Sequence, residues 1–170
     1  LLCLPFLTGE RDPRIGNLAS GSYFGIREFH GEGHLVRSIL EGVAYGLRMI
    51  RDAAAENGIR PDRLQIGGSG AQSNIWPQIV ANVLDVPVER SQTTDATLVG
   101  AAMLGFTALG HYDDIETAAK RMVRVGRPFS PSTSAVETYD EAYDFFRHVV
   151  AAMAEIYPLH ARTFSVDDAQ

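Results

Sequence analysis

Several stretches of the chain repeat apolar side chains at three- and four-residue steps, the period of a helix with one apolar face. The first predicts a helix over residues 33–56, which ends at Asn57 and Gly58 because glycine tolerates the left-handed conformation that follows many helices. Inside it, Gly42 and Gly46 weaken the helix and predict that another element comes close. Its apolar stripe consists of Leu35, Val36, Ile39, Leu40, Val43, Leu47 and Ile50.

Four later stretches predict helices over residues 74–84, 96–109, 115–123 and 135–157. The helix over 96–109 is rich in Ala and Gly, which predicts tight packing against a sheet or another backbone. We expect the last helix either to cover a sheet or to meet another subunit. Its stripe consists of Tyr139, Tyr143, Phe146, Val150, Met153 and Tyr157.

Short extended pieces separate these helices. Residues 1–31 are rich in turn-forming types and predict a mostly irregular segment that ends in an extended piece over 22–26. Short strands are predicted over 63–66 and 86–90. Alternating strands and helices predict an α/β layer with parallel pairing, and two clear strands are too few for a full sheet. We therefore expect further strands before Leu1, and the chain to be a fragment.

Composition narrows the function classes. The chain has 170 residues, of which 45% are apolar and 21% charged, and a net charge of −6. These fractions are typical of a globular domain, and the negative net charge argues against a nucleic-acid surface. No apolar run in the sequence is long enough for a membrane span. The single Cys3 excludes an internal disulfide and a cysteine-rich metal site. A reducing, cytoplasmic compartment is the expected location.

The segment "IGGSGAQSN", residues 66–74, is the main candidate site. Gly67 and Gly68 permit close approach to the backbone, and the following helix, with Asn74 or Ser73 as its N-cap, favours negative charge at its start. A P-loop needs a lysine that this turn lacks, and a dinucleotide fingerprint needs Gly or Ala where Ser73 stands. The residues alone leave two interpretations, a ligand loop or a purely structural turn.

Other candidate residues have structural interpretations. His30 and His34 have a metal-ligand spacing but no third ligand, so a solvated helix start is favoured. Glu41 is expected to accept hydrogen bonds from a neighbouring loop, and Trp76 to pack rather than to stack on a base. Glu10 and Arg11 are interpreted as a surface pair.

Three ordered segments give the sequence a family resemblance. They are "PFLTGERDP" with "ASGSYFGI", then "HLVRSILEGVAY", then "GGSGAQSNIWPQIVANVLDVPVE" with "LVGAAMLG". Over residues 4–157 they closely resemble the carboxyl-terminal domain of the FGGY carbohydrate kinases, with a xylulokinase-like pattern. The resemblance implies an α/β fold of the actin-like ATPase or ribonuclease H-like type, here partial, with a mixed sheet flanked by helices. Residues 1–160 would form most of that domain and residues 161–170 a tail.

The resemblance also implies a function. These kinases transfer the γ-phosphoryl of ATP, with Mg²⁺, to a hydroxyl of a sugar or polyol, between two domains. The catalytic base lies on the amino-terminal domain, so no catalytic residue and no metal ligand is assigned in this chain, and the fragment alone is expected to be inactive. The expected partners are the sugar and that domain, with a homodimer left open. The alternative is a non-catalytic nucleotide-binding or interaction module of the same fold.

By position, the resemblance places the adenosine part of ATP beside the glycine turn, where small residues and polar side chains would border it. This turn is one residue longer than in many members of the family. The residues expected to bind the nucleotide are Gly67, Gly68, Ser69, Gly70, Ala71, Gln72, Ser73 and Asn74.

Overall fold

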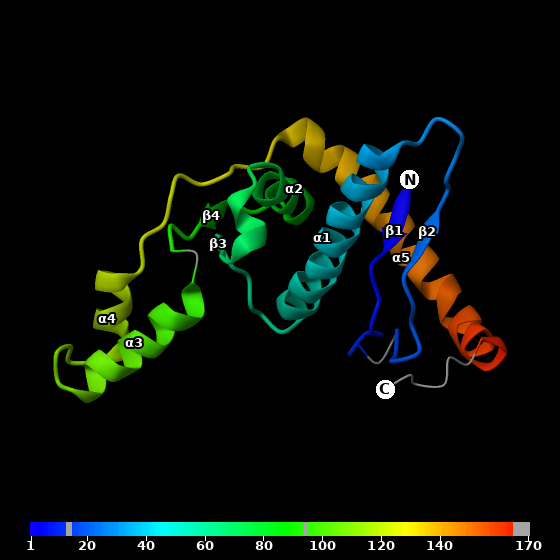
Figure 1. The fold of residues 1–170 in the computed structure, drawn as a ribbon. Coiled ribbons are helices and arrows are strands. Elements are labelled where there is room, and N and C mark those ends of the chain that lie inside the picture. Colours follow the sequence, from blue (N-terminus) through cyan, green and yellow to red (C-terminus); the bar gives the residue numbers. More distant parts are fainter. Residues whose placement is uncertain (13–14, 94, 165–170) are drawn as a thin grey trace.

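The computed structural model describes residues 1–12, 15–93 and 95–164. Helices and short strands alternate along the chain as the sequence predicts (Figure 1). The elements are β1 (Leu2–Leu4), β2 (Ser22–Phe24), α1 (Glu32–Glu56), β3 (Leu64–Ile66), the 3₁₀ turn η1 (Ser69–Gln72), α2 (Ile75–Leu84), β4 (Val88–Arg90), α3 (Ala96–Ala108), α4 (Ile115–Met122) and α5 (Thr133–Thr163).

The strands form two separate pairs on either side of α1 (Figure 1). β1 and β2 are antiparallel, with Leu2 opposite Phe24. β3 and β4 are parallel, with Ile66 opposite Arg90, so the predicted parallel pairing is confirmed. β1 lies in the segment predicted to be irregular. Its three residues are all buried, and such a short run has too few positions to show an alternation.

The core lies where α1, α2, α5 and β1 meet. α2 contributes the most completely buried face: Ile79, Val80, Val83 and Leu84 are each at most 3% exposed. α5 packs against α2 and α1, which confirms its predicted apolar stripe. Phe146 of α5 is fully buried, and the centroid of its ring lies 5.3 Å from that of Tyr45 of α1. α5 thus covers α1 and α2.

Most of the apolar stripe of α1 is left uncovered by the described residues, although Leu40 packs against the core. Val36 is 51% and Ile50 67% exposed, and the other residues of the stripe are exposed or half-buried. The residues that α1 buries are Ser38, Gly42, Ala44 and Tyr45. Small side chains line this face because β1 lies against it.

Gly42 is where α1 and β1 come closest. A Cβ atom at Gly42 would collide with the backbone carbonyl of Cys3, so the predicted close approach is confirmed there. At Gly46 a Cβ atom would meet nothing within 4 Å among the described residues. One of the two glycines therefore allows contact, and the other faces open space.

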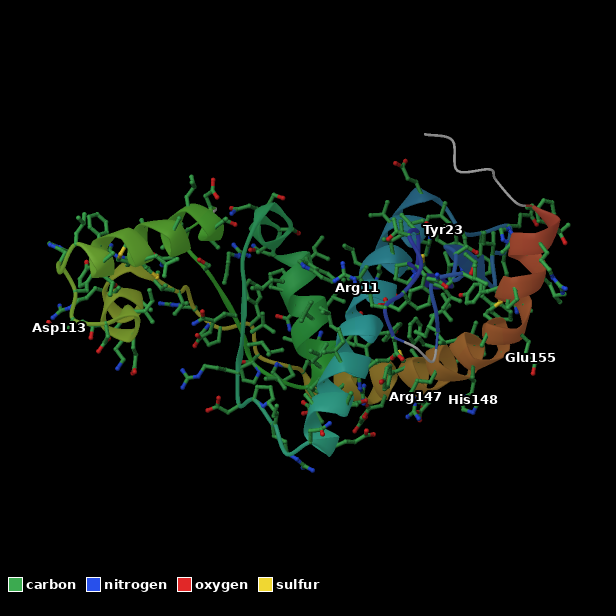
Figure 2. All side chains as sticks on the ribbon, turned by 90° about the horizontal axis from the view of Figure 1, so that it is seen from below. Arg11, Tyr23, Asp113, Arg147, His148 and Glu155 are labelled. Atoms are coloured by element: carbon green, nitrogen blue, oxygen red, sulfur yellow. The ribbon has the colours of Figure 1, made fainter. Side chains whose placement is uncertain are left out.

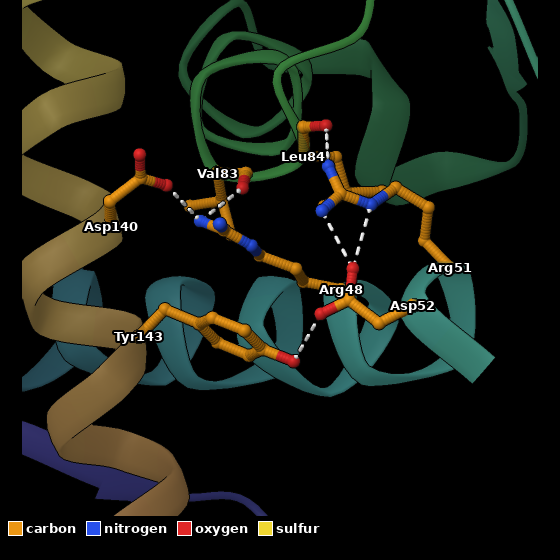
Figure 3. Close-up of polar contacts among 7 residues, drawn as sticks. All are labelled: Arg48, Arg51, Asp52, Val83, Leu84, Asp140 and Tyr143. Carbon is orange, nitrogen blue, oxygen red and sulfur yellow. Dashed lines mark hydrogen bonds and ion pairs between the residues drawn. The ribbon is translucent and has the colours of Figure 1, made fainter. Parts of the chain in front are cut away.

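Polar side chains of α1 tie it to the end of α2 (Figure 3). Arg48 Nη1 donates to the carbonyl oxygen of Val83 at 3.1 Å and pairs with Asp140 Oδ1 of α5 at 2.6 Å. Arg51 Nη1 donates to the carbonyl oxygen of Leu84. The last carbonyl groups of a helix lack partners within the helix, and cations are favourable there. The two arginines thus cap α2 from α1.

Asp52 completes this cluster. Tyr143 of α5 donates its hydroxyl to Asp52 Oδ2 at 2.8 Å, and Arg51 Nη2 donates to Oδ1 at 2.7 Å (Figure 3). Burial acts to raise the pKa of Asp52, but the hydrogen bonds from Arg51 and Tyr143 outweigh it, so the pKa is lowered. Burial, with the nearby carboxylate, raises the pKa of the Tyr143 hydroxyl. The charged form of Asp52 therefore stabilises the contact between α1 and α5.

The helix pair α3–α4 projects away from this core, with Asp113 at its far end (Figures 1 and 2). Of the residues of α3, only Met103 is buried by the described chain, and a Cβ atom at Gly100 or Gly105 would meet nothing within 4 Å. The tight packing predicted for this small-residue helix is therefore absent from the described residues, where α4 is its main neighbour.

α5 is longer than predicted. The prediction stopped at Tyr157, but the helix continues through Pro158, which cannot donate a backbone hydrogen bond, to Thr163. The first residues of the predicted tail, 161–163, are therefore helical, and 165–170 lie outside the described residues. No helix within the described ranges is long and apolar enough to cross a membrane.

Candidate functional site

The glycine turn lies at the carboxyl end of β3. Ile66 ends the strand, Gly67 and Gly68 follow, and η1 leads to α2, which begins at Ile75. Since β3 and β4 are parallel, their carboxyl ends meet at the same edge, where Arg90 ends β4. In open α/β sheets, ligands bind outside the carboxyl ends of the strands. The turn therefore occupies the edge at which a ligand is expected.

Gly68 gives the turn its shape. Its φ is 84° and its ψ is −179°, a conformation that is essentially restricted to glycine. A Cβ atom at Gly68 would meet nothing within 4 Å in the described part of the chain, so the backbone conformation, rather than crowding, requires glycine here. After it, Ala71 donates its N–H to the carbonyl oxygen of Gly68 at 3.2 Å and is 1% exposed, which anchors η1.

A cavity of about 280 Å³ lies beside the turn, between the strand ends and α3. Gly67 forms part of its wall, together with Ser91 and Thr93, which follow β4. None of its lining residues within the described chain carries an ionisable side chain. Its wall consists of Gln65, Ile66, Gly67, Ser91, Thr93, Ala96, Val99, Gly100, Met103 and Val123. Such a wall suits a flat, mostly apolar group with a few hydrogen-bonding atoms.

The start of α2 distinguishes between the two N-cap residues that the sequence left open. Asn74 occupies the N-cap position, but its side chain makes no capping hydrogen bond. Ser73 Oγ accepts from the N–H of Ile75 at 3.1 Å instead. The Asn74 side chain is held by Arg90, whose Nη2 lies 2.6 Å from Asn74 Oδ1. Pro77 falls in the first turn of α2, as predicted.

Sequence reasoning missed Arg90, Ser91 and Thr93. Their distance from the glycines along the chain hid them. The signal that finds them is the strand–helix–strand order itself, because parallel pairing brings the residue after the second strand beside the turn after the first. The eight residues expected at the nucleotide lie together in the turn, with Ser69, Gln72, Ser73 and Asn74 exposed and Ala71 buried.

The other candidates lie away from this edge. His30 Nδ1 accepts from the N–H of Arg27 at 2.8 Å, and His34 Nδ1 accepts from the N–H of Gly31 at 3.2 Å. Both rings thus serve the start of α1, as the structural interpretation predicts. Within the described residues no three His, Cys, Asp or Glu side chains gather as a metal site. Glu10 accepts from the backbone N–H of Arg11 at 2.7 Å.

Glu41 lines a larger cavity of about 660 Å³ between β2, α1 and α5. It accepts from Arg37 Nε at 2.8 Å and from the hydroxyl of Tyr139 at 2.9 Å. The expected structural role of Glu41 is confirmed, but its hydrogen-bond donors lie on α1 and α5 and not on a loop. Trp76 is half-buried and packs against the core, so its packing interpretation is also confirmed.

Comparison with known proteins agrees with this geometry. Residues 1–109 match the model of the C-terminal domain of the FGGY family of carbohydrate kinases. The xylulose kinase of Bacillus subtilis is 28% identical over 149 residues, which are 88% of this chain and 30% of that protein. The glycerol kinase of Aliivibrio salmonicida is 31% identical over 158 residues, 92% of this chain and 31% of that protein.

A solved structure shows the same fold. The crystal structure of xylulose kinase from Rhodospirillum rubrum matches 92% of this chain and 31% of its own, with a TM-score of 0.77 and 34% identity. The chain thus spans about 30% of the length of the relatives it matches. The family match covers more than half of the chain, and the structural match covers nearly all of it. We conclude that the chain belongs to the FGGY family of carbohydrate kinases and corresponds to their C-terminal domain.

Proposed function

We propose that this chain is the nucleotide-binding part of an enzyme that transfers the γ-phosphoryl group of ATP to a hydroxyl of a sugar or polyol. The observation that carries the proposal is the glycine turn at the carboxyl end of β3, with the cavity of about 280 Å³ beside it. The family consists of carbohydrate kinases, whose reaction needs such a nucleotide site.

The residues of the turn suit the adenosine part of ATP better than its phosphates. Gly67 and Gly68 allow close approach, and the cavity wall carries no charge. A triphosphate needs basic side chains or a metal, and the turn itself contains neither Lys nor Arg. We therefore place the base and ribose at this turn, bordered by the residues from Gly67 to Asn74.

The remaining parts of the reaction are assigned to the rest of the polypeptide. Mg²⁺ accompanies the phosphates of ATP, but no residue of this chain is proposed to hold it. The group that activates the sugar hydroxyl is placed on the amino-terminal domain, which also binds most of the sugar. The enzyme is expected in the cytoplasm, and the chain alone is expected to be inactive.

We further propose a xylulokinase-like substrate, because xylulose kinases are among the matches to sequence and structure. The test is phosphoryl transfer by the full-length protein from ATP to D-xylulose, glycerol and gluconate. Transfer to D-xylulose with the highest kcat/KM supports the proposal. Transfer only to another acceptor overturns the substrate, and nucleotide binding without any transfer favours the non-catalytic alternative.

A pair of glycine substitutions tests the turn. Gly68→Val forces a side chain onto a conformation restricted to glycine, so we expect the Kd for ADP to rise about tenfold or more while the affinity for sugar changes little. Gly33→Ala is the control, because Gly33 lies in the first turn of α1, away from the glycine turn, and a Cβ atom there would meet nothing within 4 Å of the described chain. Equal losses of nucleotide and sugar affinity would make the turn purely structural.

We also propose that the segment preceding Leu1 in the full-length protein covers the exposed stripe of α1. The relatives are about three times as long as the matched region, and Leu1 lies beside α1 (Figure 1). The stripe, with Val43 and Leu47 each 37% exposed, borders a groove of about 330 Å³ next to residues 5–12 and Ile15. Contiguous apolar side chains on a surface are typical of an interface.

Cysteine labelling of the full-length protein tests this cover. We expect L47C to react with a thiol reagent much more slowly than E56C, which lies at the exposed end of the same helix. The wild-type protein, with its buried Cys3, gives the background. Protection that disappears on dilution would assign the stripe to a second copy of the chain, and equal reactivity at both positions would contradict any cover.

A further inference from the structure

The glycine turn has no basic residue of its own, yet the structure brings one to it from the neighbouring strand. Arg90 ends β4 and lies opposite Ile66, the last residue of β3. Its Nη2 atom donates to the carbonyl oxygen of Ser73 at 3.0 Å and to Oδ1 of Asn74 at 2.6 Å. One guanidinium group therefore holds both the backbone and a side chain at the end of the turn.

Arg90 is itself held in place by the segment after α4. Its guanidinium carbon lies 5.1 Å from the centroid of the Phe129 ring, within the range of a cation–π interaction. The backbone of Phe129 exchanges two hydrogen bonds with Val88 of β4, at 3.0 and 2.8 Å. The carbonyl oxygen of Arg90 accepts from the N–H of Gly126 at 2.8 Å. The arginine thus has a fixed support on the side away from the turn.

The contact with Arg90 decides which way the Asn74 amide faces. Arginine carries only hydrogen-bond donors, so the atom of Asn74 that meets it must be the oxygen. The amino group, Nδ2, then faces away and keeps its hydrogens for another acceptor. Asn74 is exposed, and no hydrogen bond from this amino group occurs within the described chain. A nucleotide base offers ring nitrogens as acceptors.

We infer that Arg90 is a positioning residue for nucleotide binding, which fixes the end of the glycine turn and orients the Asn74 amide so that its amino group presents donors to the base. The inference rests on the proposed function, since it concerns the same nucleotide site. It adds a residue outside the turn, and it assigns to Asn74 the role of a hydrogen-bond donor.

The first test compares R90Q and R90K with the control R63Q in the full-length protein. Arg63 lies at the opposite end of the same strand pair and is 62% exposed. We expect R90Q to raise the Kd for ADP and the KM for ATP about tenfold or more, because it removes charged hydrogen bonds. We expect kcat and the sugar KM to change less than about twofold, R90K to be intermediate, and R63Q to resemble the wild type.

Two further measurements separate positioning from a direct contact or a general loss of structure. If Arg90 acts through the turn, adenosine and ADP lose affinity by the same factor, whereas a direct phosphate contact would weaken ADP much more. N74D keeps an oxygen for Arg90 but replaces the donor with an acceptor. We expect it to keep the Tm of the wild type and to lose nucleotide affinity.

The outcomes distinguish this inference from the proposed function. A wild-type protein that binds no ADP overturns the function itself. A wild-type protein that binds ADP, with R90Q equally tight, overturns only the role of Arg90. Should R90Q fail to fold, R90K decides through hydrogen exchange: faster exchange of the amides in residues 69–75 supports the inference, and exchange at the wild-type rate overturns it.

Discussion

α1 and α2 follow one another in the chain and carry the same kind of apolar repeat, yet they use it differently. Ile79, Val80 and Val83 of α2 are at most 3% exposed. On α1, most of the stripe that contains Val36 and Ile50 is open, and other positions make the contacts: Gly42 lies against β1, and the arginines at positions 48 and 51 bond to the end of α2. An apolar period thus predicts a helix and one apolar face, but it does not say what covers that face.

The largest expected effect comes from a matched pair of leucines. Leu84 of α2 is 2% exposed, so L84A should lower the free energy of unfolding by about 2–5 kcal/mol, as expected for a large-to-small change in a packed core. L47A removes the same atoms from the α1 stripe. If the preceding segment covers that stripe, its cost in the full-length protein approaches that of L84A. Denaturant unfolding of both variants measures the difference, and a negligible cost for L47A would contradict the cover.

The two glycines of α1 give the next comparison. G42A places a Cβ atom against the carbonyl of Cys3, so we expect a loss of about 1–3 kcal/mol from overpacking. G46A meets open space in the described residues and gains helix propensity, which we expect to be worth up to about 1 kcal/mol. Thermal unfolding of the two variants measures both stability changes. Similar effects at the two positions would mean that β1 does not rest on Gly42.

The smallest expected effect is electrostatic. The pKa of Asp52 is lowered in the folded protein, so its charge stabilises the fold above the ordinary pKa of about 3.9, and this stabilisation is lost as the pH falls through the lowered value. D52N should therefore have a lower Tm than the wild type at pH 7, and the gap should narrow below about pH 4.

Asp62 supplies the control for this pH experiment. Its side chain is 87% exposed and lies 3.7 Å from Arg63 Nε, a pair that contributes little to stability. D62N should show no gap at either pH. A Tm gap for D52N that stays constant down to acidic pH would mean that its hydrogen bonds, and not its charge, hold α1 to α5.

The sequence predicted the helices well because each has enough turns for its period to show. It missed β1, whose three buried residues are too few for an alternation. It also stopped α5 too early, since a proline such as Pro158 is a strong but not absolute signal of a helix end. The buried face of α1 could not be read from its period, because close approach selects small residues such as Gly42.

The residues of the candidate site could be found from the sequence only in part. The glycines and the polar residues after them stand together in the sequence, so the turn could be found there. Arg90 could not, because its contact with Asn74 depends on the register of two strands that the helix α2 separates. The sequence left Asn74 and Ser73 open as caps of α2, and Ser73 supplies the hydrogen bond, because the oxygen of Asn74 accepts from the distant Arg90 instead.

The register of β3 and β4 decides which side chain of β4 faces the glycine turn. A slip of β4 by one residue would bring Glu89 to the place of Arg90 and turn the neighbouring side chains to the other face. A carboxylate there would face the carbonyl oxygen of Ser73 and the amide oxygen of Asn74, so an attraction between donor and acceptors would become a repulsion. The contacts at the glycine turn therefore disfavour a shifted register of β3 and β4. A chain in which Arg90 bonds to the turn has these two strands in the correct register.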